Sequence, residues 1–99
     1  MEKEINIQPF LDGEGKITQL PKKGKVRFAV LAYLAEKFEK DRDYTEREVN
    51  VVCNIWHTFG DYFLLRRELV DHGFLNRERD GSRYWRPQEG PAPTASEEK

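Results

Sequence analysis

The stretch that decides the fold is "LRRELVDHGFLNRERDGSRYWR", residues 65–86. Its first part carries apolar residues at helical spacing and stops at Gly73, and glycine is the residue type that most often takes the left-handed conformation just past a helix. The rest alternates around Asp80-Gly81, a strong short signal for a tight β-hairpin. The stretch therefore predicts a helix followed directly by an arginine-rich hairpin.

A first helix is predicted further upstream, from about Lys22 to Lys40. Apolar residues recur there at i, i+4, i+5 and i+8, the spacing of one face of an amphipathic helix. Asp41-Arg42-Asp43 is expected to end this helix. The residues expected to face inward are Val26, Val30, Leu31, Leu34, Ala35 and Phe38, with Phe28 and Tyr33 at the margins.

Two more helices follow. Thr45 and Glu48 form a capping box that predicts the start of the second helix, and an apolar stripe runs on from there to Trp56. The connector "HTFG", residues 57–60, leads to Asp61 as the N-cap of the third helix. In the third helix the residues expected to face inward are Tyr62, Leu65, Leu69 and Val70.

This order of elements predicts an α+β fold of the winged helix-turn-helix kind. Three helices form the core, and the C-terminal β-hairpin is the wing. The domain is expected to span residues 22–86. Residues 1–21, with turn residues at 12–15, are expected to form an N-terminal β-hairpin or extended arm. Residues 87–99 are polar and acidic with three prolines, which predicts a disordered tail.

Composition limits the classes of function. The chain has 99 residues and a net charge of −1, and residues 1–86 carry 16 Lys and Arg against 15 Asp and Glu. Nucleic-acid binders are usually distinctly basic, so this balance weighs against one. A single cysteine excludes an internal disulfide. We find no apolar run near the roughly 20 residues of a membrane span and no signal pattern, so a cytoplasmic protein without membrane contact is predicted.

We find no spacing of residues that indicates catalysis. His57 and His72 lack the frame of a zinc site, and Cys53 falls within the apolar stripe of the second helix, where it is expected to be buried. The sequence therefore predicts no enzyme, no cofactor and no metal.

Three segments resemble a bacterial family catalogued as domain of unknown function 2087. They are "FLDGEGKITQLPKKGK" at 10–25, "LAYLAEKFEKDRDYTEREVN" at 31–50 and "LRRELVDHGFLNRERDGSRYWR" at 65–86, about three quarters of the chain together. The resemblance implies a winged-helix-like domain, found alone or attached to helix-turn-helix regulators. It implies no established chemistry.

Basic residues gather in three places, and each has two interpretations. On a helical wheel Arg67 shares the outward face with Leu64, Glu68 and Asp71, while Arg66 lies at the boundary; this face suits a DNA groove or a self-paired solvated surface. The hairpin arginines suit a phosphate backbone or the protection of an exposed sheet edge. The candidate DNA-binding residues are Lys22, Lys23, Lys25, Arg27, Arg66, Arg67, Arg77, Arg79, Arg83 and Arg86.

Two functions remain open. The first is a DNA-binding or transcription-associated domain whose partner is double-stranded DNA, acting as a dimer through Phe63 or Leu64. The alternative is a protein-interaction or dimerisation module on the same scaffold, without nucleic-acid binding. Near-zero charge and the acids on the third helix favour the alternative, whereas the order of elements favours DNA.

Overall fold

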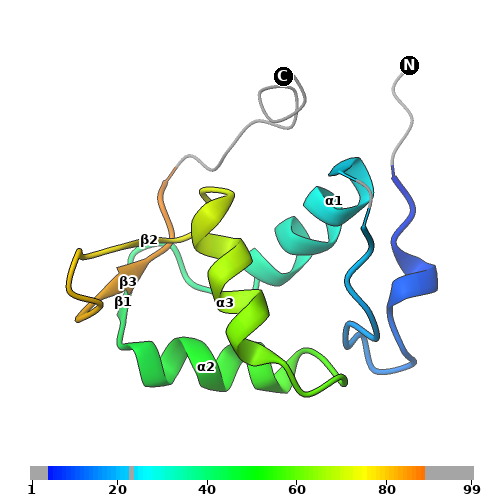
Figure 1. Ribbon diagram of the computed structural model, residues 1–99, viewed down its shortest axis with the longest axis horizontal. Helices are drawn as coiled ribbons and strands as arrows, with labels where there is room; N and C mark the ends of the chain where they lie inside the picture. The colour runs from blue at the N-terminus through cyan, green and yellow to red at the C-terminus, as the bar shows by residue number, and fades with distance from the viewer. Residues whose placement is uncertain (1–4, 23, 89–99) are drawn as a thin grey trace.

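The computed structural model describes residues 5–22 and 24–88. The chain is an α+β fold in which three helices carry a small antiparallel sheet, which confirms the α+β class predicted from the sequence (Figure 1). In chain order the elements are the 3₁₀ helix η1 (Gln8–Phe10), α1 (Gly24–Ala35), β1 (Asp43–Tyr44), α2 (Glu46–Ile55), α3 (Tyr62–Asp71), β2 (Asn76–Arg77) and β3 (Tyr84–Trp85).

The sheet lies at one end of the molecule and has the strand order β1-β3-β2, with both pairs antiparallel. The predicted hairpin is confirmed as β2 and β3, and Gly81 in its turn has a φ of +78°, a left-handed conformation that suits glycine. The strand β1 was not predicted, because Asp43 was expected only to end a helix. Its two residues pair instead with β3, where Tyr44 lies opposite Tyr84.

The first helix is shorter than predicted, because α1 ends at Ala35 rather than near Lys40. The chain then turns so that Phe38 enters the core, where its ring packs edge-on against Tyr44 with centroids 5.1 Å apart. The Tyr44 hydroxyl accepts a hydrogen bond of 2.7 Å from the Glu39 amide and stabilises this turn. Phe28, expected at the margin, is buried against Phe74.

Local signals set the ends of α2 and α3 as predicted. The Thr45 hydroxyl accepts from the Glu48 amide at 3.1 Å, and the Glu48 carboxylate accepts from the Thr45 amide at 2.9 Å, so the capping box is present. Asp61 caps α3 by accepting from the Leu64 amide at 3.1 Å. After α3, Gly73 takes the expected left-handed conformation, with a φ of +83°.

The core lies between α1, α2 and α3. Leu65 and Leu69 of α3 are fully buried, as predicted. Tyr62 was expected inward but is exposed. Residues of the connector pack at the core instead, because His57 is buried and Phe59 is partly buried against the core.

His57 is buried and joins α2 to the start of α3. Its Nε2 accepts a 2.7 Å hydrogen bond from the Asp61 amide, so Nδ1 carries the proton and donates to the Cys53 carbonyl, also at 2.7 Å. Both of these backbone groups depend on this one ring, because a buried group without a partner is costly.

His57→Ala is therefore expected to lower the free energy of unfolding by about 2–4 kcal/mol, through the loss of two hydrogen bonds and the cavity that the ring leaves. Urea denaturation followed by circular dichroism measures this change. Thr58→Ala, at the exposed neighbouring position, is the matched control. Equal urea midpoints for the two variants would contradict a bridging role for His57.

The N-terminal segment forms an arm with a tight turn, not a hairpin of two strands. The Asp12 carboxylate accepts from the amides of Glu14 and Lys16, both at 2.9 Å, and one antiparallel bridge joins Leu11 to Ile17. Ile17 is fully buried and also bridges to His57, which fastens the arm to the connector after α2. Residues 1–4 of the expected arm and 89–99 of the expected tail lie outside the described residues.

Candidate functional site

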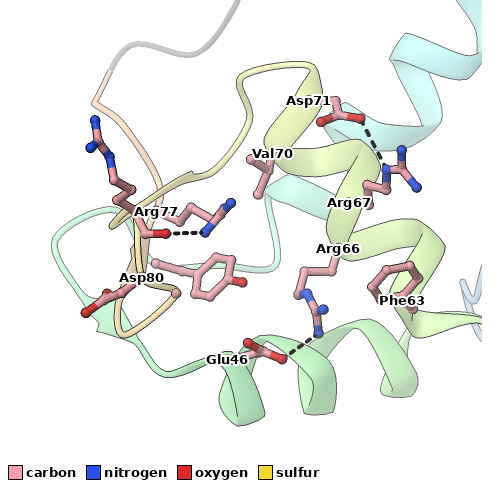
Figure 2. A pocket seen from close by; sticks show the side chains of 11 residues that line it. Glu46, Phe63, Arg66, Arg67, Val70, Asp71, Arg77 and Asp80 are labelled. Atoms are coloured by element: carbon pink, nitrogen blue, oxygen red, sulfur yellow. Dashed lines mark hydrogen bonds and ion pairs between the residues drawn. The ribbon is translucent and has the colours of Figure 1, made fainter.

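A hollow of about 460 Å³ lies between α3 and the β2–β3 hairpin. We name it the α3–hairpin surface. Figure 2 shows Arg77 extending from the hairpin toward α3, and Arg66 extending from α3 toward Glu46 of α2. The residues that line it are Phe63, Arg66, Arg67, Val70 and Asp71 of α3, Arg77, Arg79, Asp80, Gly81 and Tyr84 of the hairpin, and Glu46 of α2.

The walls of this surface are held by the core. Leu65 and Leu69 fix α3 from its opposite side, and the buried ring of Tyr84 anchors β3. Val70, expected inward, packs partly against the core and also lines the hollow. Buried residues therefore hold α3 and the hairpin in place, and the exposed side chains of the surface are not needed for this.

Arg66 is an anchored residue of this surface. Its side chain is only 14% exposed, and Nη1 lies 2.6 Å from Oδ1 of Asn50 and 3.3 Å from Oε2 of Glu46. The guanidinium also lies over the Phe63 ring, 5.1 Å from its centroid. Arg66 thus ties α3 to α2, and its charge is already neutralised.

Arg67 is much more exposed, and its Nε lies 3.8 Å from Oδ2 of Asp71, one turn further along α3. Such an exposed i, i+4 pair contributes only about 0.2–0.5 kcal/mol to the helix. The pair leaves Arg67 accessible to another anion.

The two hairpin arginines of the surface form no ion pair with a carboxylate among the described residues. Arg77 donates to the carbonyl oxygens of Glu78 and Arg79, each at 3.2 Å, and so braces the turn. Arg79 is exposed, and its guanidinium makes no hydrogen bond or ion pair with residues 5–22 or 24–88. Of the four arginines that line the α3–hairpin surface, these two are the most available to an incoming anion.

Arg83 and Arg86 belong to the fold rather than to this surface. Arg83 forms ion pairs with Glu78 and with Asp43, the latter at 3.3 Å, and hydrogen bonds to these two carboxylates raise its pKa further. Its guanidinium also lies 4.3 Å from the centroid of the Trp85 ring. Arg86 donates to the Phe38 carbonyl at 3.0 Å.

The basic residues at the start of α1 are not brought to the α3–hairpin surface. Lys22 and Lys25 are exposed, and Lys23 lies outside the described residues. In Figure 1 the start of α1 lies at the opposite end of the molecule from the hairpin. Arg27 is held by Glu68 and by the Pro21 carbonyl, both at 3.1 Å. Of the ten predicted residues, four share one surface: Arg66, Arg67, Arg77 and Arg79.

Glu68 was expected on the outward face of α3, but the structure turns it toward α1. Its Oε1 lies 3.1 Å from Nε of Arg27 and 3.1 Å from Nε2 of His72. The wheel misses this because α1 covers that flank of α3. Burial raises the pKa of Glu68, but the hydrogen bonds and charges of Arg27 and His72 outweigh it, so the pKa lies below its ordinary value.

This shift predicts a pH dependence. Because the folded pKa of Glu68 is below its ordinary value of 4.5, its stabilising effect is complete above that value and is lost as the pH falls through the folded pKa. Wild type should exceed Glu68→Gln in urea midpoint at pH about 6, and the gap should narrow as the pH falls below 4.5. Urea titrations at several pH values test this, and a gap that persists at the lowest pH contradicts it.

The predicted contact pair is split by the structure. Phe63 is 53% exposed and lines the α3–hairpin surface, whereas Leu64 is partly buried.

Sequence reasoning missed Val51 and Ile55, which are exposed one turn apart on α2. Their signal was an apolar i, i+4 pair on the opposite side of α2 from Val49 and Cys53. It also missed Glu46, Asp80 and Tyr84 as parts of the site.

Two further observations concern the described part of the chain. Within residues 5–22 and 24–88, no three His, Cys, Asp or Glu side chains are grouped so that they could hold a metal ion. No helix there is both long and apolar enough to traverse a bilayer. Cys53 is fully buried, and burial raises the pKa of its thiol to about 12.

The fold and the surface define a small α+β domain with a mixed-charge hollow beside its third helix. A family model described as "Uncharacterized protein conserved in bacteria (DUF2087)" matches residues 16–86. The chain belongs to this family, which confirms the family resemblance seen in the sequence. No curated protein and no solved structure matches the chain.

Proposed function

We propose that this chain is a winged-helix domain that binds double-stranded DNA through the α3–hairpin surface, in a cytoplasmic, transcription-associated role and without enzymatic activity. Support for the winged-helix part comes from the element order α1-β1-α2-α3-β2-β3, with β1 completing the sheet beside the hairpin. A short connector joins α2 to α3, as in a helix-turn-helix.

The dimensions of α3 suit this proposal. Its 10 residues make a cylinder about 15 Å long, and a major groove about 12 Å wide admits an α-helix. The outward positions Phe63, Arg67 and Asp71 follow one another at intervals of four residues along one face. A helix lying in a groove would present this face to the base edges.

The single observation that carries the proposal is that Arg77 and Arg79 of the hairpin flank the same hollow as the outward face of α3. When a helix occupies a groove, the phosphates at the rim of the groove come close to a loop beside that helix. Arginines on such a loop gain affinity by displacing counterions from the DNA. A single domain has one such helix, so we propose that two copies act together on adjacent half-sites.

Fluorescence anisotropy with a labelled mixed-sequence duplex, at about 50 mM salt, tests the proposal. Wild type is expected to bind in the range of tens of micromolar or tighter. The Arg77→Ala/Arg79→Ala variant should bind about tenfold or more weakly. Its plot of log affinity against log salt should also be shallower, by about 0.9 in slope for each phosphate that the variant no longer neutralises.

Arg79→Ala alone should also bind more weakly than wild type. Lys16→Ala is its matched control, because it too removes one positive charge, but from the N-terminal arm, which lies away from the hairpin in Figure 1. It should bind nearly as well as wild type. No binding by wild type at tens of micromolar, or an equal loss in Lys16→Ala and Arg79→Ala, contradicts the proposal.

A second candidate, a protein-interaction or dimerisation module, is favoured by two observations. Phe63 is exposed at the hollow, and Arg66 and Arg67 are paired with carboxylates. If this function is right, the assembly formed by Phe63→Ala differs in mass from that of wild type in light scattering, whereas the assembly formed by Arg79→Ala has the wild-type mass. An unchanged mass for Phe63→Ala counts against it.

A further inference from the structure

The α3–hairpin surface contains its own anions. Three carboxylates, those of Glu46, Asp71 and Asp80, line it together with four arginines. A duplex that approaches this surface therefore meets acidic groups as well as guanidiniums. A phosphate can bind one of these paired arginines only by displacing its carboxylate.

The Arg66–Glu46 pair is the one that stays closed. Arg66 is 14% exposed and has a second partner, Asn50, at 2.6 Å. Opening this pair would leave a largely buried guanidinium with an incomplete set of acceptors and would loosen α3 from α2. Arg66 is therefore a fixed part of the wall.

The Arg67–Asp71 pair is the one that can exchange. Both side chains are more than half exposed, at 65% and 57%, and the distance of 3.8 Å is long for an ion pair. Asp71 also stands in the last turn of α3, where a negative charge is unfavourable against the helix dipole. Its carboxylate thus contributes little to the fold, but it occupies the guanidinium that points outward from the middle of α3.

Resting on the proposed function, we infer that Asp71 is an electrostatic brake on DNA binding: its carboxylate holds Arg67 in the free protein and must give way to a backbone phosphate in the complex. The availability of Arg67 is then set within the chain. Arg77 and Arg79, which form no ion pair with a carboxylate of the described residues, make the first phosphate contacts, and Arg67 joins only after the exchange.

Asp71→Asn tests this inference, because it keeps the shape of the side chain and removes its charge. In the same anisotropy assay it is expected to bind the duplex about twofold more tightly than wild type, because Arg67 then reaches the phosphate without first giving up its ion pair with Asp71. The gain should vanish in Asp71→Asn/Arg67→Ala, because it passes through Arg67.

Glu14→Gln is the matched control, since it makes the same change of net charge in the turn of the N-terminal arm. It should bind like wild type. If wild type binds but Asp71→Asn binds no better, or if Glu14→Gln gains as much, or if the gain survives in Asp71→Asn/Arg67→Ala, the brake is wrong although the proposed function stands. If none of these proteins binds duplex, the proposed function fails and the inference fails with it.

Discussion

Phe38→Ala is expected to lower the free energy of unfolding by about 3–5 kcal/mol. Its ring is 1% exposed and lies against Tyr44, so truncation opens a cavity between the end of α1 and the sheet. The Phe38 carbonyl also accepts from Arg86, which joins the segment after α1 to the residue that follows β3. Urea denaturation followed by tryptophan fluorescence measures the loss.

Phe63→Ala makes the same chemical change at an exposed position and is expected to cost less than about 1 kcal/mol. If the two phenylalanine variants lose equal stability, Phe38 does not occupy the core as described. The two variants also distinguish a phenylalanine that stabilises the core, Phe38, from one that is exposed where a partner can reach it, Phe63.

Leu69→Ala is expected to cost about 2–5 kcal/mol. Leu69 is fully buried on α3, and its carbonyl accepts from the amides of Phe74 at 2.8 Å and Leu75 at 3.1 Å, where the chain leaves the helix for β2. A cavity here should loosen both the helix and the start of the hairpin. Thermal and urea unfolding, with hydrogen exchange at the amides of Phe74 and Leu75, report the two effects.

Leu64→Ala is the matched control, with the same change at a partly buried position of the same helix. It is expected to cost about 1 kcal/mol. An equal loss in Leu64→Ala and Leu69→Ala would mean that α3 is rotated relative to its described orientation, and the outward face assigned to DNA would then be wrong as well.

The parts of the fold that could be predicted from the sequence are those in which a few neighbouring residues decide the conformation. The capping box at Thr45, the N-cap at Asp61, the left-handed Gly73 and the turn at Gly81 each depend on groups close to one another in the chain. Because their hydrogen bonds join residues close together in the chain, the local sequence is enough to predict the conformation.

The parts that were missed depend on residues far apart in the chain. The strand β1 exists because Tyr44 pairs with the distant Tyr84, and Glu68 turns inward because Arg27 lies on the helix beside it. A helical wheel states which residues oppose the core, but it does not state which flank another helix covers. The early end of α1 has the same origin, in the packing of Phe38 on Tyr44.

Four arginines of the candidate site and one of its carboxylates, Asp71, were predicted from the sequence, but its other two carboxylates were not. Arg66, Arg67, Arg77 and Arg79 lie on one surface, but Glu46 and Asp80 were not predicted to line it with them. Arg83 could not be separated from this set by sequence, because its partner Asp43 belongs to the unexpected strand. Some arginines are free to bind an anion, and others hold the fold together. Only the carboxylates that lie beside each arginine in the structure tell the two apart.

The buried thiol at position 53 makes the chain its own stability probe. Because the only cysteine of the sequence is enclosed and hard to ionise, an alkylating reagent can reach it only when the helices separate. Under native conditions the rate of alkylation therefore counts these openings in the unaltered protein. The stabilities of the variants can be ranked from their alkylation rates, without denaturant and without an added label.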